Sequence, residues 1–293
     1  MKTIDVAGAR FCYDEAGEAR DGTIIVLHGG RGIGDHRSEL EAYRPLADRY
    51  RVIAYDQRGC GQTSLTPPFT FARLADDVNE MRKALVGDQR CILLGGSFGG
   101  MIALSAAVRH PDAFTHLFLR GTAPSHDMEV EAIANFEARI HKATSASLGM
   151  VEKMFSDQVV DDVELRLIWF ALAPLYREQF DPDAALESTR TMFLHAETHN
   201  ALYRNKEQYD VRESMRGIRI PTFVFCGASD WICAPSQSKL IASRIPGAEL
   251  MIVDGANHSV HHEANELVIA RIRDFLARHR PVQNRLGQNR LGQ

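Results

Sequence analysis

The chain has 293 residues, of which 45% are apolar, and a formal net charge of -4. This length is sufficient for one large α/β domain with an insertion, and the acidic balance excludes a basic surface for nucleic acid. No apolar run approaches membrane-spanning length, and the first residues lack the apolar core of a signal peptide, so we expect a cytoplasmic protein without a membrane partner. The five cysteines are scattered without paired spacing, which is typical of buried, reduced thiols.

The first part of the chain alternates strand-like and helix-like segments, as in a mostly parallel sheet flanked by helices. A continuous apolar run at residues 23–27 predicts a strand that is covered on both faces. A helical period at residues 71–85 predicts a helix that packs on this sheet. The other predicted strands are 3–6 and 10–13, which would form a hairpin, and 51–55, 91–94 and 115–119.

A serine lies between the strand at 91–94 and the helix-like run that follows it. Gly95 and Gly99 flank Ser97 in the pattern Gly-x-Ser-x-Gly, and because they lack a Cβ, a sharp turn can close and expose the hydroxyl. The following helix directs backbone N–H groups toward negative charge that forms beside the serine. A purely structural glycine turn is the alternative, but the strand before Ser97 and the helix after it favour a catalytic nucleophile.

The strand at 23–27 ends in a glycine-rich loop, residues 28–36. A flexible turn is one interpretation of this loop. The better one is a close backbone approach, in which the N–H of Gly30 joins the N–H of Phe98 to bind an oxyanion. Arg31 follows Gly30 directly, where it would either attract an anionic substrate or remain solvated.

The strand at 51–55 ends in a second loop that carries charged side chains. Asp56 and Arg58 are close enough in sequence to pair, which would fix this loop beside the Ser97 turn. We expect such a pair to support the turn structurally and to take no part in the chemistry.

From residue 124 the sequence changes to helix-like segments punctuated by prolines, with no strand among them. A helical insertion between two parts of one sheet can cover the strand ends near Ser97 and form the substrate pocket, so we call it the cap. The helix-like segments are 129–155, 163–175 and 186–203, and a closing helix is predicted at 269–280. The predicted divisions are a core at 1–123 and 214–281, the cap at 124–213, and a polar tail at 282–293 in which QNRLG occurs twice.

Two later strands, at 222–225 and 249–253, each end in a loop with an ionisable side chain. Asp230 follows the first strand and His258 follows the second. Because the C-terminal strand ends share one edge of an open α/β sheet, both side chains are expected to converge on Ser97. The chain order Ser, Asp, His predicts a triad in which His258 removes the serine proton and Asp230 holds the imidazole.

Two other readings of these loops stay open. Asp254 also follows a strand, but it is only four positions before His258 and is typical of a turn. His258, His261 and His262 suggest a metal site, although no carboxylate or cysteine supplies a matching ligand set. We therefore predict catalysis without a metal ion and without a cofactor.

The chain resembles the proline iminopeptidase group of the α/β-hydrolases in five motifs that occur in order: HGGRGIGDH, DQRGCGQTS, GGSFGG, GASDWICAPSQS and DGANH. The resemblance covers residues 23–276 and is weakest across the cap. It implies an α/β-hydrolase fold with an inserted helical cap that shapes specificity. It also implies a triad and an oxyanion hole, formed by Ser97, Asp230 and His258 and by Gly30 and Phe98, respectively.

The sequence departs from this family at two positions. Arg31 replaces the proline of the usual HGGPG loop, and Phe98 stands where tryptophan is frequent. Arg31 and Trp231 adjoin Gly30 and Asp230, so both are candidate substrate-binding residues. Family members hold the free amine of the substrate with cap carboxylates, for which the available glutamates are Glu131, Glu137, Glu178, Glu187 and Glu197.

We predict a serine hydrolase whose partner is a small molecule or a short peptide. The first hypothesis is an aminopeptidase or amidase similar to proline iminopeptidase, which needs a free α-amine on the substrate. The second is a carboxylesterase or lactonase on the same scaffold, which is indifferent to that amine. A third hypothesis, a non-catalytic ligand-binding protein, is disfavoured by the intact set of serine, aspartate and histidine.

Overall fold

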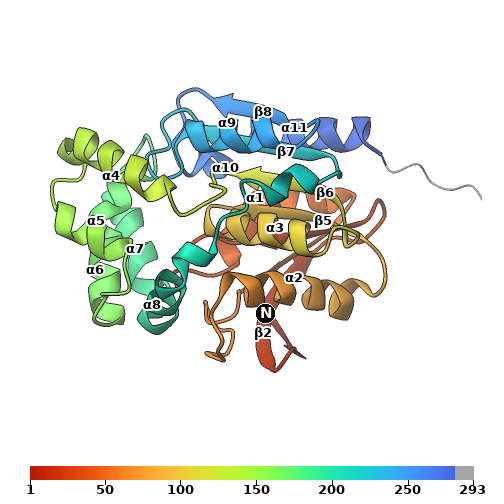
Figure 1. Ribbon diagram of the computed structural model, residues 1–293, viewed down its shortest axis with the longest axis horizontal. Coiled ribbons are helices and arrows are strands. Elements are labelled where there is room, and N and C mark those ends of the chain that lie inside the picture. The colour runs from red at the N-terminus through yellow and green to blue at the C-terminus, as the bar shows by residue number, and fades with distance from the viewer. Residues whose placement is uncertain (281–293) are drawn as a thin grey trace, which may run out of the picture.

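An eight-stranded sheet runs through the centre of the molecule (Figure 1), and the computed structural model describes residues 1–280. The strands are β1 (Lys2–Val6), β2 (Ala9–Ala16), β3 (Thr23–Leu27), β4 (Arg51–Tyr55), β5 (Cys91–Gly96), β6 (Phe114–Arg120), β7 (Thr222–Gly227) and β8 (Glu249–Val253). They lie in the order β1-β2-β4-β3-β5-β6-β7-β8. The β1–β2 hairpin and the β2–β4 pair are antiparallel, and β3 to β8 run parallel. The predicted hairpin and the mostly parallel sheet are both confirmed.

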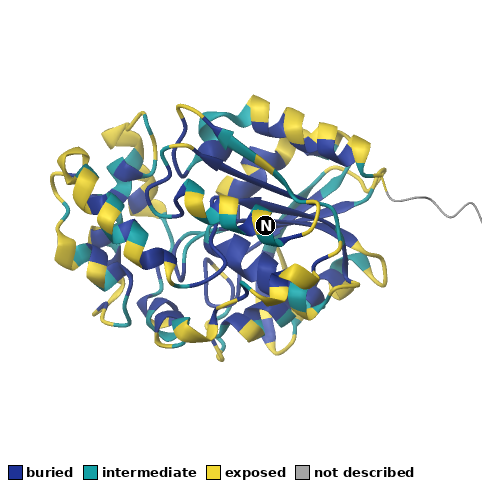
Figure 2. Cartoon of the chain, turned by 45° about the horizontal axis from the view of Figure 1, so that its top comes forward, coloured by how far each residue is buried: buried dark blue, intermediate teal, exposed yellow. Residues whose placement is uncertain are grey.

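Helices cover both faces of the sheet because both faces of its central strands are apolar. The flanking helices are α1 (Arg37–Tyr43), α2 (Phe71–Val86), α3 (Phe98–Arg109), α9 (Pro235–Arg244), α10 (Val260–Glu263) and α11 (Asn265–Arg278). Side chains alternate along a strand, so Ile25 of β3 belongs to the apolar cluster that includes α2, α3 and α9, whereas Ile24 belongs to the cluster that includes α1 and α11. Figure 2 shows the result: buried strands lie between helices whose outer faces are exposed.

The helix predicted at 71–85 illustrates how the local sequence forms these layers. Thr70 caps the N-terminus of α2, since its side chain accepts a hydrogen bond from a backbone N–H of the first turn. Leu74, Val78 and Met81 recur at helical spacing and are fully buried against the sheet. The prediction is therefore confirmed to within one residue at its C-terminal end.

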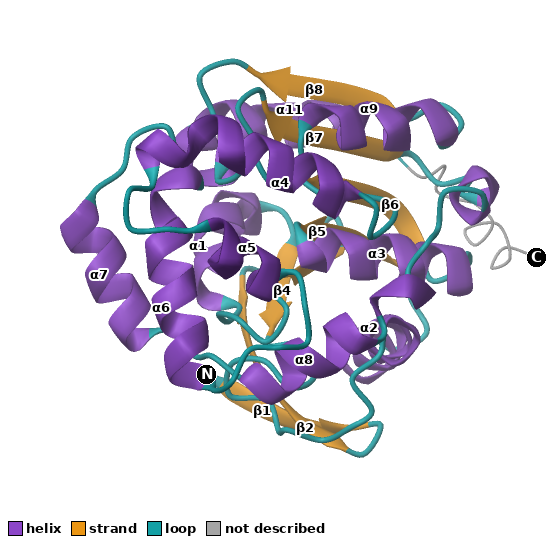
Figure 3. Ribbon diagram, turned by 60° about the vertical axis from the view of Figure 1, so that its left-hand side comes forward, coloured by secondary structure: helices purple, strands orange, loops and turns teal. Residues whose placement is uncertain are grey.

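Between β6 and β7 the chain forms a group of helices that lies at one end of the sheet (Figure 1). Figure 3 looks toward this group, which we call the inserted helices. They are α4 (Met128–Arg139), α5 (Leu148–Met154), α6 (Asp162–Leu172), α7 (Pro182–Thr191) and α8 (Ala196–Arg204). The strands on either side continue one sheet, so the insertion interrupts the sequence of the core and leaves its pairing intact.

Two of the predicted helical segments are wrong in their extent. The segment predicted at 129–155 consists of α4 and α5, because Ser147 accepts a hydrogen bond from Met150 N and starts a new helix. The segment predicted at 186–203 is likewise split into α7 and α8. Leu194 lies between them in extended backbone and pairs with Ile33 of the glycine-rich loop, which ends α7 early.

Two expectations for the whole chain can be compared with residues 1–280. All five cysteines are buried and unpaired, which confirms the prediction of reduced, buried thiols. Within residues 1–280, none of the helices combines the length and the apolar character needed to span a bilayer. The QNRLG repeat lies outside the described residues.

Candidate active site

Ser97 occupies the turn between β5 and α3 in a strained backbone conformation. Its φ of 53° and ψ of -124° lie where residues with a side chain are rarely found. The end of β6 holds this conformation: Ser97 N donates to Arg120 O at 2.8 Å, and Thr122 Oγ1 donates to Ser97 O at 2.7 Å. The fold therefore stabilises a conformation that lifts one serine hydroxyl out of the strand end.

Glycines are required on both sides of this serine, as the motif predicts. A Cβ on Gly95 would clash with Gly99 O, and a Cβ on Gly99 would clash with the carbonyl oxygen of Leu27 in β3. Gly29 approaches from the glycine-rich loop, where a Cβ would lie 3.0 Å from Ser97 Cβ. This close packing brings the backbone of Gly29 next to the serine.

Asp230, after β7, and His258, after β8, meet in a buried hydrogen bond. The bond joins Asp230 Oδ2 and His258 Nδ1 at 2.8 Å. Asp230 Oδ1 accepts two further bonds, from Ile232 N at 3.1 Å and Cys233 N at 2.9 Å. Because the carboxylate only accepts, Nδ1 of the imidazole carries the proton and Nε2 is left as a base. Asp254, the alternative carboxylate, is exposed in the turn after β8.

Gly121, which follows β6, leaves room for this pair. A Cβ at its position would lie 2.8 Å from Asp230 Oδ2 and 3.5 Å from His258 Nδ1, and its φ of 44° also favours glycine. No sequence motif points to this residue. Its position directly after a strand was the one available signal.

Arg120, at the end of β6, binds the loop that carries His258. Its Nη1 donates to His258 O at 3.0 Å, and its Nη2 donates to Glu39 Oε1 of α1 at 2.6 Å. Both charged side chains are almost fully buried. Since Arg120 O also receives the N–H of Ser97, one residue positions the backbone of both Ser97 and His258. Sequence reasoning missed this role, because it depends on contacts with distant segments.

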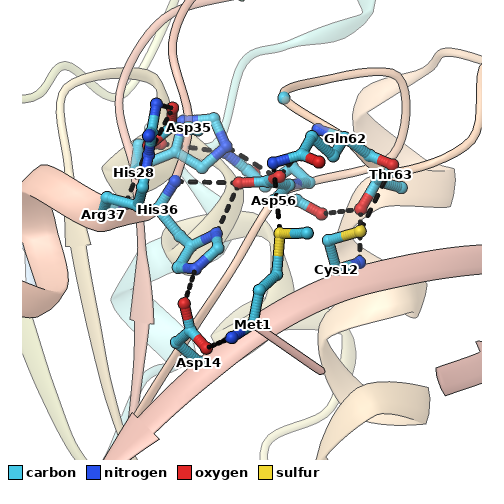
Figure 4. Close-up of polar contacts among 12 residues, drawn as sticks. Met1, Cys12, Asp14, His28, Asp35, His36, Arg37, Asp56, Gln62 and Thr63 are labelled. Carbon is cyan, nitrogen blue, oxygen red and sulfur yellow. Dashed lines mark hydrogen bonds and ion pairs between the residues drawn. The ribbon is translucent and has the colours of Figure 1, made fainter. Parts of the chain in front are cut away.

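The glycine-rich loop is tied to the loop after β4 by a buried polar network (Figure 4). Asp56 Oδ1 accepts hydrogen bonds from His36 N at 2.9 Å and from His36 Nδ1 at 2.6 Å. The other ring nitrogen, Nε2, lies 3.2 Å from Asp14 Oδ2, so only a doubly protonated ring donates to both carboxylates. Burial alone would lower the pKa of His36, but the hydrogen bonds and charges of Asp56 and Asp14 outweigh it and raise that pKa.

The expected pair between Asp56 and Arg58 is wrong. The Asp56 carboxylate is occupied by His36 and by Gln62 N, which donates to Oδ2 at 2.7 Å. Arg58 instead forms a two-point ion pair with Asp77 of α2, at 2.6 and 2.8 Å. The loop after β4 is thus anchored in two directions, to the glycine-rich loop and to α2.

A cavity of about 830 Å³ lies between the strand ends and the inserted helices. From the core it is lined by five of the predicted site residues: Gly30, Arg31, Ser97, Phe98 and His258. From the inserted helices and the loops between them it is lined by Met154, Phe155, Trp169, Tyr176, His199 and Tyr203, among others. The serine and the histidine therefore line one cavity that can hold a small substrate.

Trp231 lies behind this wall and does not line it. The indole is fully buried and packs against Tyr176, whose ring centroid lies 5.6 Å away. Tyr176 in turn packs edge-on against the His258 ring at 5.4 Å. The indole is therefore outside the cavity wall, and the Tyr176 ring packs against both Trp231 and His258.

Arg31 is buried, so the alternative of a solvated arginine is wrong. Only 6% of the residue is exposed, and its guanidinium lies over the ring of Tyr203 at 4.1 Å.

The five glutamates considered for amine recognition lie outside the cavity wall. Within residues 1–280, none of them lines it. Glu131, for example, accepts hydrogen bonds from Ser236 and Gln237.

A metal site has no support in the described part of the chain. No group of three or more histidine, cysteine, aspartate or glutamate side chains there is arranged to hold a metal ion. The rings of His261 and His262 contact each other, and burial lowers the pKa of both, to about 4 for His262.

Comparison with known proteins places this geometry in a family. Residues 22–265 match the model of the alpha/beta hydrolase fold family. The chain belongs to this family. It is 43% identical over 278 residues to the proline iminopeptidase PfmaB of Pestalotiopsis fici, an alignment that covers 94% of this chain and 99% of the relative.

Solved structures of the α/β-hydrolase family have the same fold. An alpha/beta fold family hydrolase from Bacillus anthracis superposes with a TM-score of 0.75 and 22% identity, over 94% of this chain and 98% of the other. An enol-lactonase from Burkholderia xenovorans superposes with a TM-score of 0.67 and 23% identity, over 94% and 100%. The protein is thus an α/β-fold hydrolase that is similar to proline iminopeptidases.

Proposed function

We propose that the protein cleaves a small amide or ester through an acyl-enzyme formed on Ser97. The hydrogen bond between Asp230 Oδ2 and His258 Nδ1, at 2.8 Å, supports this most strongly. It orients the imidazole so that Nε2 is free to act as a base, in a cavity that Ser97 also lines. A serine hydroxyl needs such a base because it is a weak nucleophile at neutral pH.

The reaction would proceed in two halves. His258 Nε2 removes the proton of Ser97 as Oγ attacks the carbonyl carbon, and the N–H groups of Gly30 and Phe98 stabilise the tetrahedral oxyanion. The imidazolium then donates its proton to the leaving amine or alcohol, and the acyl group stays on Oγ. Water, deprotonated by the same imidazole, releases the acid and restores the serine.

In this proposal residues 124–213 act as a cap on a core formed by 1–123 and 214–281. The inserted helices contribute part of the cavity wall, and they also hold the catalytic loops. Asn135 of α4 donates to Trp231 O at 3.1 Å, and Ser259 N donates to Tyr176 O at 3.1 Å. Closing the cap would exclude water and set the size of the substrate. The buried, unpaired thiols are compatible with a reducing cytoplasm as the site of action.

The relatives favour an aminoacyl amide as the substrate, since PfmaB is named a proline iminopeptidase. One observation supports an ester or lactone as the second candidate. The five glutamates expected to hold a free amine do not line the cavity, whereas the cation of Arg31 does; the carboxylates that line it are Asp35, Glu39, Glu41 and Asp181. The two candidates differ in whether a free α-amine is needed.

A matched panel of chromogenic substrates tests the proposal. Proline and alanine p-nitroanilides are compared with p-nitrophenyl acetate and butyrate, each with the wild type and with Ser97→Ala. Ser97-dependent cleavage of the anilides supports an aminopeptidase, and Ser97-dependent cleavage of the esters alone supports an esterase. Turnover that persists in Ser97→Ala, or no turnover of any substrate, would contradict the proposed function.

A further inference from the structure

We propose that Arg31 forms an anion-binding subsite, so that the acyl part of the substrate carries a carboxylate close to the scissile carbonyl. This inference rests on the proposed hydrolase function and names its substrate class. It starts from the position of Arg31, which directly follows Gly30 of the proposed oxyanion hole and lines the same cavity as Ser97.

The guanidinium of Arg31 is held in place by aromatic rings. Its Cζ lies 4.1 Å from the ring centroid of Tyr203, 5.5 Å from that of Phe71 and 5.7 Å from that of Phe98. Nη2 contacts the Met101 sulfur at 3.6 Å. Nη1 is buried and has no hydrogen-bond partner among the described residues, and neither does Glu129 Oε1, which lies 3.8 Å from it. These contacts orient a planar cation, but they leave part of its hydrogen-bonding capacity unused.

The charges around Arg31 do not balance. Glu129 of α4 is the nearest carboxylate, with Oε1 at 3.8 Å from Arg31 Nη1. The same carboxylate binds Lys206 more tightly, through Oε2 at 2.5 Å from Nζ. One carboxylate is therefore shared by two cations, the buried Arg31 and the partly exposed Lys206, which leaves one net positive charge beside this part of the wall. An unbalanced buried charge is costly unless a counter-ion is supplied.

The other polar groups near Arg31 do not supply this charge. The Nδ1 atom of His199 lies 3.2 Å from Arg31 O. The His199 ring is neutral at neutral pH, because burial lowers its pKa to about 4. Tyr203 is also neutral, since burial raises the pKa of its phenol. A carboxylate on the substrate would complete the cluster, and arginine recognises that group by two parallel hydrogen bonds.

Sheet topology indicates which side of the substrate carries the anion. Ser97 follows β5, Arg31 follows β3 on one side of it, and His258 follows β8 on the other side. His258 must protonate the leaving group, so the leaving group lies toward β8. The acyl chain then extends toward β3 and Arg31. The substrate class is thus the monoester or monoamide of a short dicarboxylic acid.

The test compares charged and neutral esters of equal chain length in a pH-stat assay. Monomethyl succinate, glutarate and adipate are paired with methyl butyrate, valerate and hexanoate. We expect kcat/KM of the wild type to be at least about tenfold higher for one of the charged esters than for its neutral partner. Arg31→Met should remove this preference, and Arg31→Lys should retain part of it, since it keeps the charge and loses the planar fork.

Two substitutions outside the cavity wall give a signature that a merely structural arginine would not produce. Lys206→Met frees Glu129 to neutralise Arg31, so the preference for charged esters should fall. Glu129→Gln removes the competing carboxylate, so the preference should rise. The matched control is Arg177→Met, because Arg177 is an exposed arginine that lines the same cavity, and here the preference should change less than twofold.

The inference is overturned if the wild type treats charged and neutral esters alike, or if Arg31→Met leaves the preference unchanged. Calorimetry with glutarate and its neutral counterpart glutaramide provides a readout without turnover. Binding of glutarate alone, lost in Arg31→Met, would support the subsite even if every ester proved inert and the hydrolase proposal failed. Equal binding of the two compounds, or no binding of either, would overturn the subsite while leaving Ser97-dependent hydrolysis to be judged by the chromogenic panel.

Discussion

At the scale of single residues, the site is defined by how completely its polar groups are paired. The Asp230 carboxylate is buried and receives three hydrogen bonds, two from backbone N–H groups and one from His258. It therefore cannot rotate to another partner, and the imidazole is confined to one tautomer. Arg31 shows the opposite condition, because its charge is buried and only partly balanced.

We predict that Asp230→Asn lowers kcat roughly 10³- to 10⁴-fold with little effect on the fold, because an amide no longer fixes the proton on Nδ1 of His258. The matched control is Asp254→Asn, in the exposed turn after the next strand. This variant should keep its activity to within about twofold. A large loss in Asp254→Asn together with a small one in Asp230→Asn would show that the carboxylate has been assigned to the wrong residue.

At the scale of helices and strands, element bounds were predicted best where apolar residues recur with a single period, that of a strand or that of a helix. The central strands β3 and β4 and the edge strand β8 were predicted with their observed bounds, and α2 to within one residue, because their apolar residues recur with the spacing of a strand or a helix. The helices α1 and α9 were missed. Each is at most ten residues long and has few apolar positions, so its face toward the sheet leaves little pattern in the sequence.

A substitution in the turn after β5 tests how strictly the local geometry is set. Gly99→Ala should destabilise the protein by more than about 2 kcal/mol, because the new Cβ meets the backbone oxygens of Leu27 and His28, which cannot move without separating α3 from β3. Gly149→Ala is the control, since its Cβ would lie 3.9 Å from the nearest atom, Ser147 Oγ. It should be neutral or stabilise α5 by up to about 1 kcal/mol. Chemical denaturation of both variants measures the difference, and equal stabilities would contradict this account of the turn.

At the scale of the whole molecule, the candidate site combines parts that are distant in sequence. The motifs predict a triad of Ser97, Asp230 and His258, because each follows a strand whose end lies on a known edge of the sheet. In the structure Asp230 and His258 share a hydrogen bond, and Ser97 and His258 line one cavity. The motifs identified Arg31 as a candidate without predicting its burial, and they missed Arg120, because the surroundings of these residues come from the inserted helices and from α1. Burial of Arg31 depends on Tyr203, about 170 residues along the chain, and no local pattern carries that information.

Buried histidines make the stability of the whole molecule depend on pH. The folded-state pKa of His199 is lowered to about 4, mainly by burial, so between pH 6.5 and about 4 the unfolded state binds more protons than the folded state. Stability should therefore fall as the pH is lowered through this window. His36 acts in the opposite direction, since its raised pKa gives stability that is present below pH 6.5 and is lost as the pH rises through the folded-state pKa.

Urea denaturation at pH 7 and at pH 4.5 tests this prediction for His199. The loss in the free energy of unfolding between the two pH values should be smaller by about 2 kcal/mol in His199→Gln than in the wild type. His141→Gln, which alters an exposed histidine after α4, should behave like the wild type. Parallel losses in the wild type and His199→Gln would show that His199 is not kept neutral by burial.

The most direct test of the central claim is covalent labelling of the wild type with an alkyl fluorophosphonate, read by intact-protein and peptide mass spectrometry. Ser97 Oγ attacks phosphorus and fluoride leaves, so the label reports on an activated serine without any assumption about the natural substrate. We predict one phosphonyl group per chain, located on Ser97, with loss of esterase or amidase activity in proportion to labelling. Labelling should be absent in Ser97→Ala and strongly slowed in Asp230→Asn. An unlabelled wild type, or a label on another residue, would contradict the assignment of Ser97 as the nucleophile.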